Sequence, residues 1–189
     1  MPNIYIISGC NGAGKTTASY TILPEMLHCN EFVNADSIAS GLSPFNSESQ
    51  SFAAGRLMIK RIKQLMSEKF DFAIETTLAA KSYKQLILSA KSKGYKITLV
   101  FFWISSAKLA IERIKLRVKK GGHGVPEDIV IRRYRRGIEN LIKIFIPICD
   151  YWMIVDNSMN KFSLIAEGNF NVEKIIYNNN VWRVINQYG

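Results

Sequence analysis

The sequence lacks the features that define several large classes of protein. Its longest uninterrupted apolar stretch runs only from Leu99 to Ile104, with Ile97 just before it, far short of the roughly 20 residues that span a membrane. No basic and apolar leader opens the chain, so we expect no secretory signal, no membrane partner and a cytoplasmic location. The three cysteines are odd in number and lack metal-ligand spacing, which argues against a disulfide scaffold and a zinc site. They are Cys10, Cys29 and Cys149.

Acidic residues are also scarce, and the imbalance is local. The 189 residues carry 25 Lys and Arg against 15 Asp and Glu, a formal net charge of +10. The segment from Lys108 to Arg136 holds ten of these basic residues and only three acidic ones. Such a patch suits a polyanionic partner, and a short one suits a lid over a triphosphate at least as well as a nucleic-acid track. With 48% hydrophobic residues, the chain is long enough for one buried domain and short for two.

A phosphate-binding motif is the most specific feature present. Residues Gly9 to Thr16 match the pattern G-x-x-x-x-G-K-[ST], follow an apolar run and precede a helical pattern. Glycines let the backbone turn tightly, so that its N–H groups point at phosphate oxygens without a side chain in the way. Lys15 is expected to reach the β and γ phosphates, and the hydroxyl of Thr16 to bind Mg²⁺. The expected binding residues are Gly9, Cys10, Asn11, Gly12, Ala13, Gly14, Lys15, Thr16 and Thr17.

Strand-like and helix-like segments alternate along the chain. Apolar or β-branched runs at residues 4–7, 31–33, 72–74, 95–104 and 151–155 are separated by amphipathic helical patterns. This order is typical of a parallel sheet with helices on both faces. We predict an α/β fold of the P-loop NTPase or kinase type, a three-layer sandwich with a five-stranded, mostly parallel sheet and a basic helical lid.

The same patterns predict a domain boundary and one helix face. Residues 1–159 are expected to form the kinase-like domain, and residues 160–189 an appendage packed on it. In this appendage, the runs at 162–166 and 172–177 favour a hairpin, followed by a short helix at 179–188. The helix expected at about residues 47–69 has an apolar face, to which we assign Phe52, Leu57, Ile59, Ile62, Leu65 and Met66.

Polar side chains stand where two of the predicted strands end. Asp36 follows the second strand, and Glu75, Thr76 and Thr77 end the third. Ligands bind at this edge of an open α/β sheet, so these side chains should meet the phosphate loop. Asp36 is the candidate general base for a hydroxyl acceptor, although it is equally suited to cap the helix after it. The carboxylate of Glu75 needs a metal-bound water or substrate hydroxyls to offset its burial, and the two threonines suit contacts to a sugar.

Arginines repeat at helical spacing on either side of a glycine-rich joint. Arg113 and Arg117 share one helix face, Arg132 and Arg136 share another, and residues 121–124 lie between the two pairs. Such a joint would let a lid at about residues 113–136 swing and carry one or two arginines onto the phosphates.

Together these motifs resemble the zeta-toxin family of P-loop kinases, in its short single-domain bacterial branch. The resemblance extends from the phosphate loop to Ser158 and rests also on residues 34–36, 53–57, 74–78, 121–127, 131–134 and 156–158. It implies ATP as phosphate donor and a hydroxyl of a UDP-activated amino sugar, such as UDP-N-acetylglucosamine, as acceptor. It also implies a toxin of a toxin–antitoxin system, with an antitoxin protein as partner.

The resemblance assigns roles to individual residues. The expected catalytic set is Lys15, Asp36 as base, and the lid arginines Arg117, Arg132 and Arg133. The expected substrate contacts are Asp36, Arg56, Glu75, Thr76 and Thr77. The chain departs from the better-known toxins at Asn11, where they carry proline, and in its short length.

Two other functions fit the same residues. One is a regulatory ATPase associated with nucleic acid, with the arginine cluster as its track. The chain lacks the interleaved aromatic residues typical of single-strand binding, which disfavours nucleic acid as a partner. The other is a kinase of a polynucleotide 5′-hydroxyl or of an antibiotic.

Overall fold

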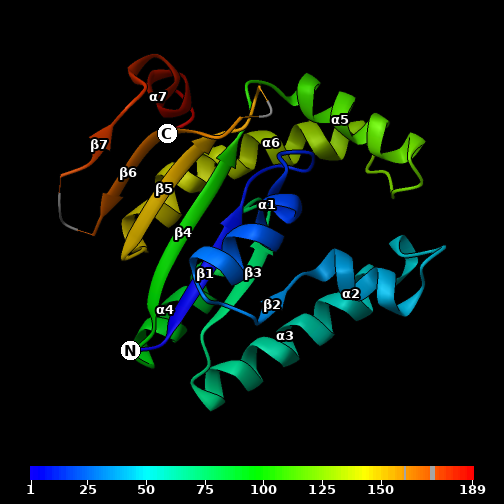
Figure 1. The fold of residues 1–189 in the computed structure, drawn as a ribbon, viewed down its shortest axis with the longest axis horizontal. Coiled ribbons are helices and arrows are strands. Elements are labelled where there is room, and N and C mark those ends of the chain that lie inside the picture. The colour runs from blue at the N-terminus through cyan, green and yellow to red at the C-terminus, as the bar shows by residue number, and fades with distance from the viewer. Residues whose placement is uncertain (160, 171–172) are drawn as a thin grey trace.

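Seven strands form one sheet in the computed structural model, which describes residues 1–159, 161–170 and 173–189. The strand order is β2-β3-β1-β4-β5-β6-β7 (Figure 1). The first five strands pair in parallel, whereas β6 and β7 are antiparallel to their neighbours. The bounds are β1 (Asn3–Ser8), β2 (Phe32–Val33), β3 (Phe72–Thr76), β4 (Lys96–Trp103), β5 (Tyr151–Asp156), β6 (Ser163–Asn169) and β7 (Ile175–Ile176).

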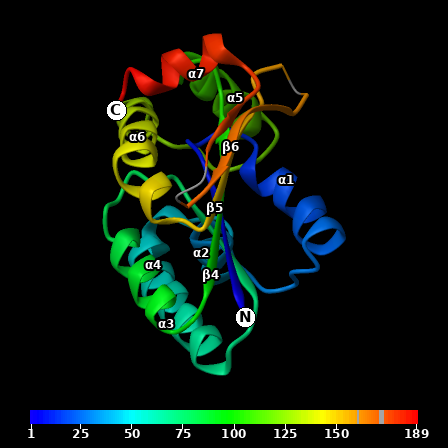
Figure 2. The same cartoon turned by 90° about the vertical axis from the view of Figure 1, so that its left-hand side faces the viewer.

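Helices cover both faces of this sheet, with α1 on one side and α4 and α6 on the other (Figure 2). The α-helices are α1 (Lys15–Thr21), α2 (Ala35–Leu42), α3 (Ser51–Glu68), α4 (Tyr83–Ser92), α5 (Ala107–Lys119), α6 (Glu127–Asn140) and α7 (Asn179–Asn186). Short π or 3-10 turns are η1 (Ile22–Met26), η2 (Glu48–Gln50), η3 (Leu141–Phe145) and η4 (Ile146–Ile148). The predicted three-layer α/β fold is therefore confirmed.

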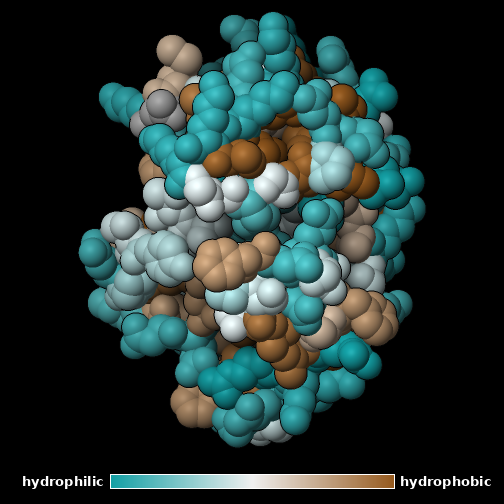
Figure 3. Space-filling view, turned by 90° about the vertical axis from the view of Figure 1, so that its right-hand side faces the viewer, coloured by the Kyte–Doolittle hydropathy of each residue, from teal (hydrophilic) through white to brown (hydrophobic). Residues whose placement is uncertain are grey.

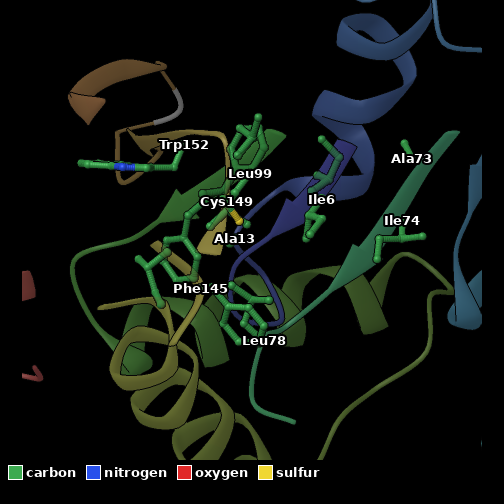
Figure 4. Close-up of a cluster of buried hydrophobic side chains, with 14 of the residues drawn as sticks. Ile6, Ala13, Ala73, Ile74, Leu78, Leu99, Phe145, Cys149 and Trp152 are labelled. Atoms are coloured by element: carbon green, nitrogen blue, oxygen red, sulfur yellow. The ribbon is translucent and has the colours of Figure 1, made fainter. Parts of the chain in front are cut away.

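The core lies along β1, β3 and β4, the central strands of the sheet. Ile6, Ile74 and Leu99, one from each strand, have no exposed surface. Strands buried on both faces read as continuous apolar runs, which is why β4 was the clearest strand in the sequence. Figure 4 shows Ala13 of the phosphate loop among these buried side chains, so the loop is built directly onto the core.

The sheet is wider than the five strands that the sequence predicts. β6 pairs with β5 with a register shift at Ile154 and Val155, and β7 pairs with β6 through two residues. The residues expected to form a hairpin do pair antiparallel as β6 and β7, and this pair also extends the main sheet; Asn160, where the appendage was expected to begin, and Val172 lie outside the described residues. The helix α7 packs on this end, where Trp182 stacks on Trp152 with ring centroids 5.9 Å apart.

The apolar face predicted for α3 is wrong for three of its six residues. Phe52, Leu57 and Ile59 are exposed, whereas the helix buries Ala54, Met58, Ile62, Leu65 and Met66. The buried set follows the i, i+4, i+8 row of one helix face, and the three exposed residues lie off that row. Figure 3, seen from the side of the molecule that faces right in Figure 1, shows hydrophobic patches within a largely hydrophilic surface.

Within the described residues, no helix is both long and apolar enough to cross a membrane.

Candidate active site

Two adjoining cavities open at the edge of the sheet where the parallel strands end. The first, about 530 Å³, is lined by the phosphate loop, the start of α2 and the last turns of α5. The second, about 440 Å³, is lined by the segment after β3, the start of α4 and one face of α6. We call the first the donor cavity and the second the acceptor cavity, after the phosphate donor and the phosphate acceptor that the sequence leads us to expect. Five residues line both: Asn11, Lys15, Asn34, Asp36 and Glu75.

The phosphate loop adopts a conformation that only glycine tolerates at three positions. Gly9, Gly12 and Gly14 have φ angles of 137°, 80° and 86°, in the region that L side chains rarely adopt. An added Cβ would lie 2.3 Å from Phe102 O at Gly9, 2.8 Å from Ala110 O at Gly12 and 2.5 Å from Asn157 Nδ2 at Gly14. The expected reason for these glycines, room for the anion, is therefore incomplete: the loop also packs against β4, α5 and the end of β5.

Asn157 secures this loop from the far side of the sheet edge. Its buried side chain donates from Nδ2 to the carbonyl oxygen of Ala13 at 2.9 Å. A buried amide with its hydrogen bond satisfied holds a loop in one conformation. Residues 156–158 stand out in the sequence without an evident role, and this hydrogen bond gives Asn157 one.

Lys15 is buried at the bottom of the loop and already has two partners. Its Nζ donates to the carbonyl oxygen of Cys10 at 3.0 Å and lies 3.5 Å from Glu75 Oε1. The Cys10 side chain itself is buried, and this burial raises the pKa of its thiol to about 11. Cys10 thus contributes its backbone to the site, and its thiol stays protonated at neutral pH.

Glu75 is the centre of the polar contacts between the loop and the sheet. Its Oε2 accepts from Thr16 Oγ1 at 2.8 Å and from Asn34 Nδ2 at 2.7 Å. The chain's own donors, together with Lys15, therefore offset the burial of this carboxylate. The hydroxyl of Thr16 and the carboxylate of Glu75 are hard oxygen ligands of the kind that Mg²⁺ takes beside water and phosphate, so the residues fit a magnesium ion bound with a nucleotide.

Asp36 is free to face the site because its neighbour takes the capping role. The N-cap of α2 is Asn34, whose Oδ1 accepts from the backbone N–H groups of Asp36 and Ser37. Asp36 lies in the first turn, where the helix dipole favours a carboxylate, and lines both cavities. Its Oδ2 lies 3.7 Å from His123 Nε2, across the opening of the donor cavity.

The acceptor cavity combines hydroxyls, an aromatic ring and arginines. Thr76 and Thr77 both line the cavity; Thr76 is the buried one, and its Oγ1 accepts from the backbone N–H of Leu78 at 3.1 Å. Tyr83 lines the same cavity; burial raises the pKa of its phenol, a hydrogen bond with Thr76 lowers it and the charge of Asp36 raises it again. The cationic wall is formed by Arg132, Arg133 and Arg136 of α6.

Two hydrogen-bond donors of Arg117 lack an acceptor among the described residues. Its Nε and Nη2 are buried and have no partner among the residues that the structure describes. It lines the donor cavity beside the phosphate loop. Donors buried without partners cost free energy, and an incoming phosphate oxygen would satisfy them.

The other arginine on this face of α5 has a structural role. Arg113 donates from Nη2 to the carbonyl oxygens of Asn157 at 2.7 Å and Ser158 at 3.1 Å. It ties α5 to the segment after β5.

Most of the predicted residues converge at the site, and Arg56 does not. Its guanidinium carbon lies 4.9 Å above the ring of Phe52, on α3, and it lines neither cavity. Asn34, Tyr83, Asn157 and His123 were not among the predicted site residues, and Arg136 was predicted only as one of the lid arginines. Asn34 directly precedes a helix, which is the signal for a cap; the others are brought to the site by tertiary packing.

The strand order, the phosphate loop after β1 and the carboxylates at the neighbouring strand ends define a P-loop protein of the kinase type. More specifically, the chain belongs to the zeta toxin family, whose model matches residues 1–147. An uncharacterized protein of Haemophilus influenzae is 32% identical over 126 residues, which are 67% of this chain and 88% of that protein.

Solved structures with the same fold are more distant in sequence. A chain of the AvrRxo1-ORF1:AvrRxo1-ORF2 complex with sulphate ions is 15% identical with a TM-score of 0.79, and the match covers 98% of this chain. The present chain spans only 63% of that longer chain. A chain of the PezAT chromosomal toxin-antitoxin system of Streptococcus pneumoniae is 18% identical with a TM-score of 0.64, covering 100% of this chain and 86% of that one.

Proposed function

We propose that this protein is an ATP-dependent kinase that transfers the γ-phosphate to a hydroxyl of a UDP-amino sugar, such as UDP-N-acetylglucosamine. The observation that carries the proposal is the meeting of two cavities at Lys15, Asp36 and Glu75. An enzyme that only hydrolysed ATP would need no second cavity. Here the phosphate loop lines the donor cavity, and the acceptor cavity adds hydroxyl, aromatic and arginine side chains.

In the proposed reaction, Asp36 accepts the proton of the acceptor hydroxyl as its oxygen bonds to the γ-phosphorus. The bond between this phosphorus and the oxygen that bridges it to the β-phosphate breaks, and ADP leaves. Lys15 and the loop N–H groups hold the β and γ phosphates. Mg²⁺, held by Thr16 with Glu75 behind it, would neutralise charge on the phosphate oxygens.

Arg117 completes the proposed donor site. Its buried Nε and Nη2 would bind the charge that develops on the transferred group, a role in which one arginine contributes about 10³–10⁵ in rate. It stands at the end of α5, where Gly122 folds back so closely that an added Cβ would lie 2.6 Å from Arg117 Cγ. We place the moving part of the lid in this turn, because α6 has a buried face.

The acceptor cavity suits an anionic nucleotide sugar. Arg132, Arg133 and Arg136 offer forked donors that match a diphosphate, and the ring of Tyr83 offers a face for a base or sugar. Asp36 lines both cavities, so it lies where the reacting hydroxyl would have to be, and Thr77 lines the acceptor cavity.

A screen for phosphorylated products tests this function. Purified protein is incubated with Mg·ATP and a panel of nucleotide sugars, aminoglycosides and 5′-hydroxyl oligonucleotides, and products that gain one phosphate are detected by mass spectrometry. We expect a UDP-amino sugar to be modified, no product with Lys15→Ala, and a rate loss of about 10²–10⁴ with Asp36→Asn. Asp128→Asn removes an exposed carboxylate that lines neither cavity and should match wild type.

The outcomes separate the alternatives. Phosphate gain only on an oligonucleotide or an antibiotic would replace the proposed acceptor. An unchanged rate with Asp36→Asn would remove the proposed base.

We propose further that the activity is toxic and is countered by an antitoxin protein. The support is membership of the zeta toxin family and the fold shared with a chain of the PezAT toxin-antitoxin system. Induced expression in bacteria should arrest growth with the wild-type chain and not with Lys15→Ala at equal protein level. Normal growth with an active enzyme would contradict the toxin role.

A further inference from the structure

A side-chain hydrogen bond joins the phosphate loop to α6. Arg133 Nη1 donates to Asn11 Oδ1 at 3.1 Å, across 122 positions of sequence. Asn11 is 7% exposed. A hydrogen bond from a charged donor to a buried acceptor is stronger than a neutral one.

Both ends of this contact stand on fixed elements. On the loop side, Asn11 lies between the tightly packed Gly9 and Gly12. On the helix side, Tyr134 Oη donates to the carbonyl oxygen of Ile104 at 2.9 Å, and Asn140 Nδ2 donates to that of Leu78 at 2.8 Å. The contact therefore fixes the position of the guanidinium group at the end of the flexible Arg133 side chain.

The contact also lies where the two cavities meet. Asn11 lines both, whereas Arg133 lines only the acceptor cavity. Of the three arginines on the acceptor wall, Arg132 and Arg136 are exposed. Arg133 is the one that the phosphate loop holds in place.

We propose that Asn11 is a positioning residue that holds the Arg133 guanidinium at the border of the two cavities. This inference rests on the proposed kinase function. One Nη1 hydrogen is used by Asn11, and the remaining N–H groups of the guanidinium are left to bind the phosphoryl group or the acceptor's phosphate. The position needs an uncharged oxygen, because a carboxylate there would face the triphosphate.

A double-mutant cycle tests the positioning role. We expect Asn11→Ala to lower kcat about tenfold, the loss of one hydrogen bond to a charged group, with the Kd of ATP changed less than about twofold. The double variant with Arg133→Ala should be no slower than Arg133→Ala alone. Multiplied losses in the double variant, or a loss of Asn11→Ala confined to ATP affinity, would overturn the proposal.

Two further variants control for charge and chemistry. Arg135→Ala removes an arginine from the same helix that is exposed and lines neither cavity, and should keep kcat within about twofold of wild type. Asn11→Asp keeps the oxygen acceptor and adds a charge beside the phosphates, so the KM for ATP should rise. If Asn11→Asp instead lowers kcat as much as Asn11→Ala does and leaves the KM for ATP unchanged, the hydrogen bond to Arg133 does not explain the loss of activity.

A readout that does not need the acceptor separates this inference from the proposed function. In arginine side-chain ¹⁵N NMR spectra, the Arg133 guanidinium should show slowed hydrogen exchange in wild type and in Asn11→Asp, and fast exchange in Asn11→Ala. If no hydroxyl compound is phosphorylated, the proposed function fails, and the same cycle is measured on ATP hydrolysis. Fast exchange in wild type, or independent losses in that assay, would overturn the Asn11–Arg133 link.

Discussion

The phosphate loop and the glycine turn at residues 120–126 are both rich in glycine, and their glycines are packed differently. In the loop, an added Cβ at Gly9, Gly12 or Gly14 would come within 2.3 to 2.8 Å of another atom. In the turn, Gly121 has the same φ as Gly14, 86°, with nothing within 4 Å of an added Cβ, whereas a Cβ on Gly122 would lie 2.6 Å from Arg117 Cγ. Glycine thus serves dense packing at all three loop positions, but in the turn only where Gly122 meets Arg117.

The two regions also differ in whether their polar groups have hydrogen-bond partners. In the loop, the carbonyl oxygen of Ala13 and the side chains of Thr16 and Lys15 already have partners, through Asn157 and Glu75. Beside the turn, Arg117 keeps two buried donors without a partner in the described part of the chain. A preorganised donor site needs no rearrangement to hold phosphate, whereas in the proposed function Arg117 would gain its acceptors only when phosphate arrives.

The largest expected effect concerns Arg117, which lies beside the glycine turn. Arg117→Ala should lower kcat about 10³-fold, because it removes the charge proposed to meet the transferred phosphate. The melting temperature of the Arg117→Ala protein should not fall, because the substitution also removes two buried donors without partners. Lys119→Ala, an exposed neighbour that lines neither cavity, is the control for charge. A kcat loss equal to that of Lys119→Ala would remove Arg117 from the site.

Two alanine variants, at Gly9 and Gly121, compare the packing of the two segments. Gly9→Ala should lower the free energy of unfolding by about 3 kcal/mol or more, because the Cβ meets the Phe102 carbonyl at a φ that alanine avoids. Gly121→Ala meets only the φ cost, about 1 kcal/mol. Urea unfolding of both variants measures the difference. Equal losses would show that the two glycine-rich segments are packed alike.

The contact between the turn and Asp36 should have a small effect. His123 and Asp36 have exposed side chains, 39% and 60% accessible, and lie 3.7 Å apart. Exposed ion pairs contribute about 0.2–1 kcal/mol, so His123→Gln should change kcat by less than about fivefold at pH 7. Steady-state kinetics check this value. A loss of about 100-fold would instead give His123 a direct part in the reaction.

The last prediction concerns the loop thiol, which should leave the reaction itself unaffected. Because burial raises the pKa of Cys10 to about 11, only about one thiol in 10³ is ionised at pH 8. Iodoacetamide should therefore label the native protein at Cys10 at least about 100-fold more slowly than the unfolded protein at this pH. The labelling rate should rise with pH toward 11, since the raised pKa delays ionisation. Peptide mass spectrometry follows the site, and fast labelling at pH 8 would show that the loop opens.

Local patterns predicted the segments whose signal is contained in a few adjacent residues. β4 was readable because a strand buried on both faces is apolar throughout, and the phosphate loop because its glycines and Lys15 follow a strand. The face of α3 was misjudged because several rows of that helix carry apolar residues, and only contacts with the rest of the fold decide which row is buried. The width of the sheet was missed because pairing of β6 with β5 is a contact between segments, which neither segment encodes alone.

By itself, the sequence determined the fold class, the phosphate loop and the candidates Asp36 and Glu75, because each is written in neighbouring residues whose geometry follows from covalent structure and period. Only the tertiary structure decided that Asn34 caps α2 and leaves Asp36 free, that Glu75 meets Thr16, and that Arg56 points elsewhere. It alone brought Arg133 to Asn11 and left Arg117 with unmet donors. Such relations depend on distances across elements far apart in the chain, and packing fixes them only once the whole core has formed.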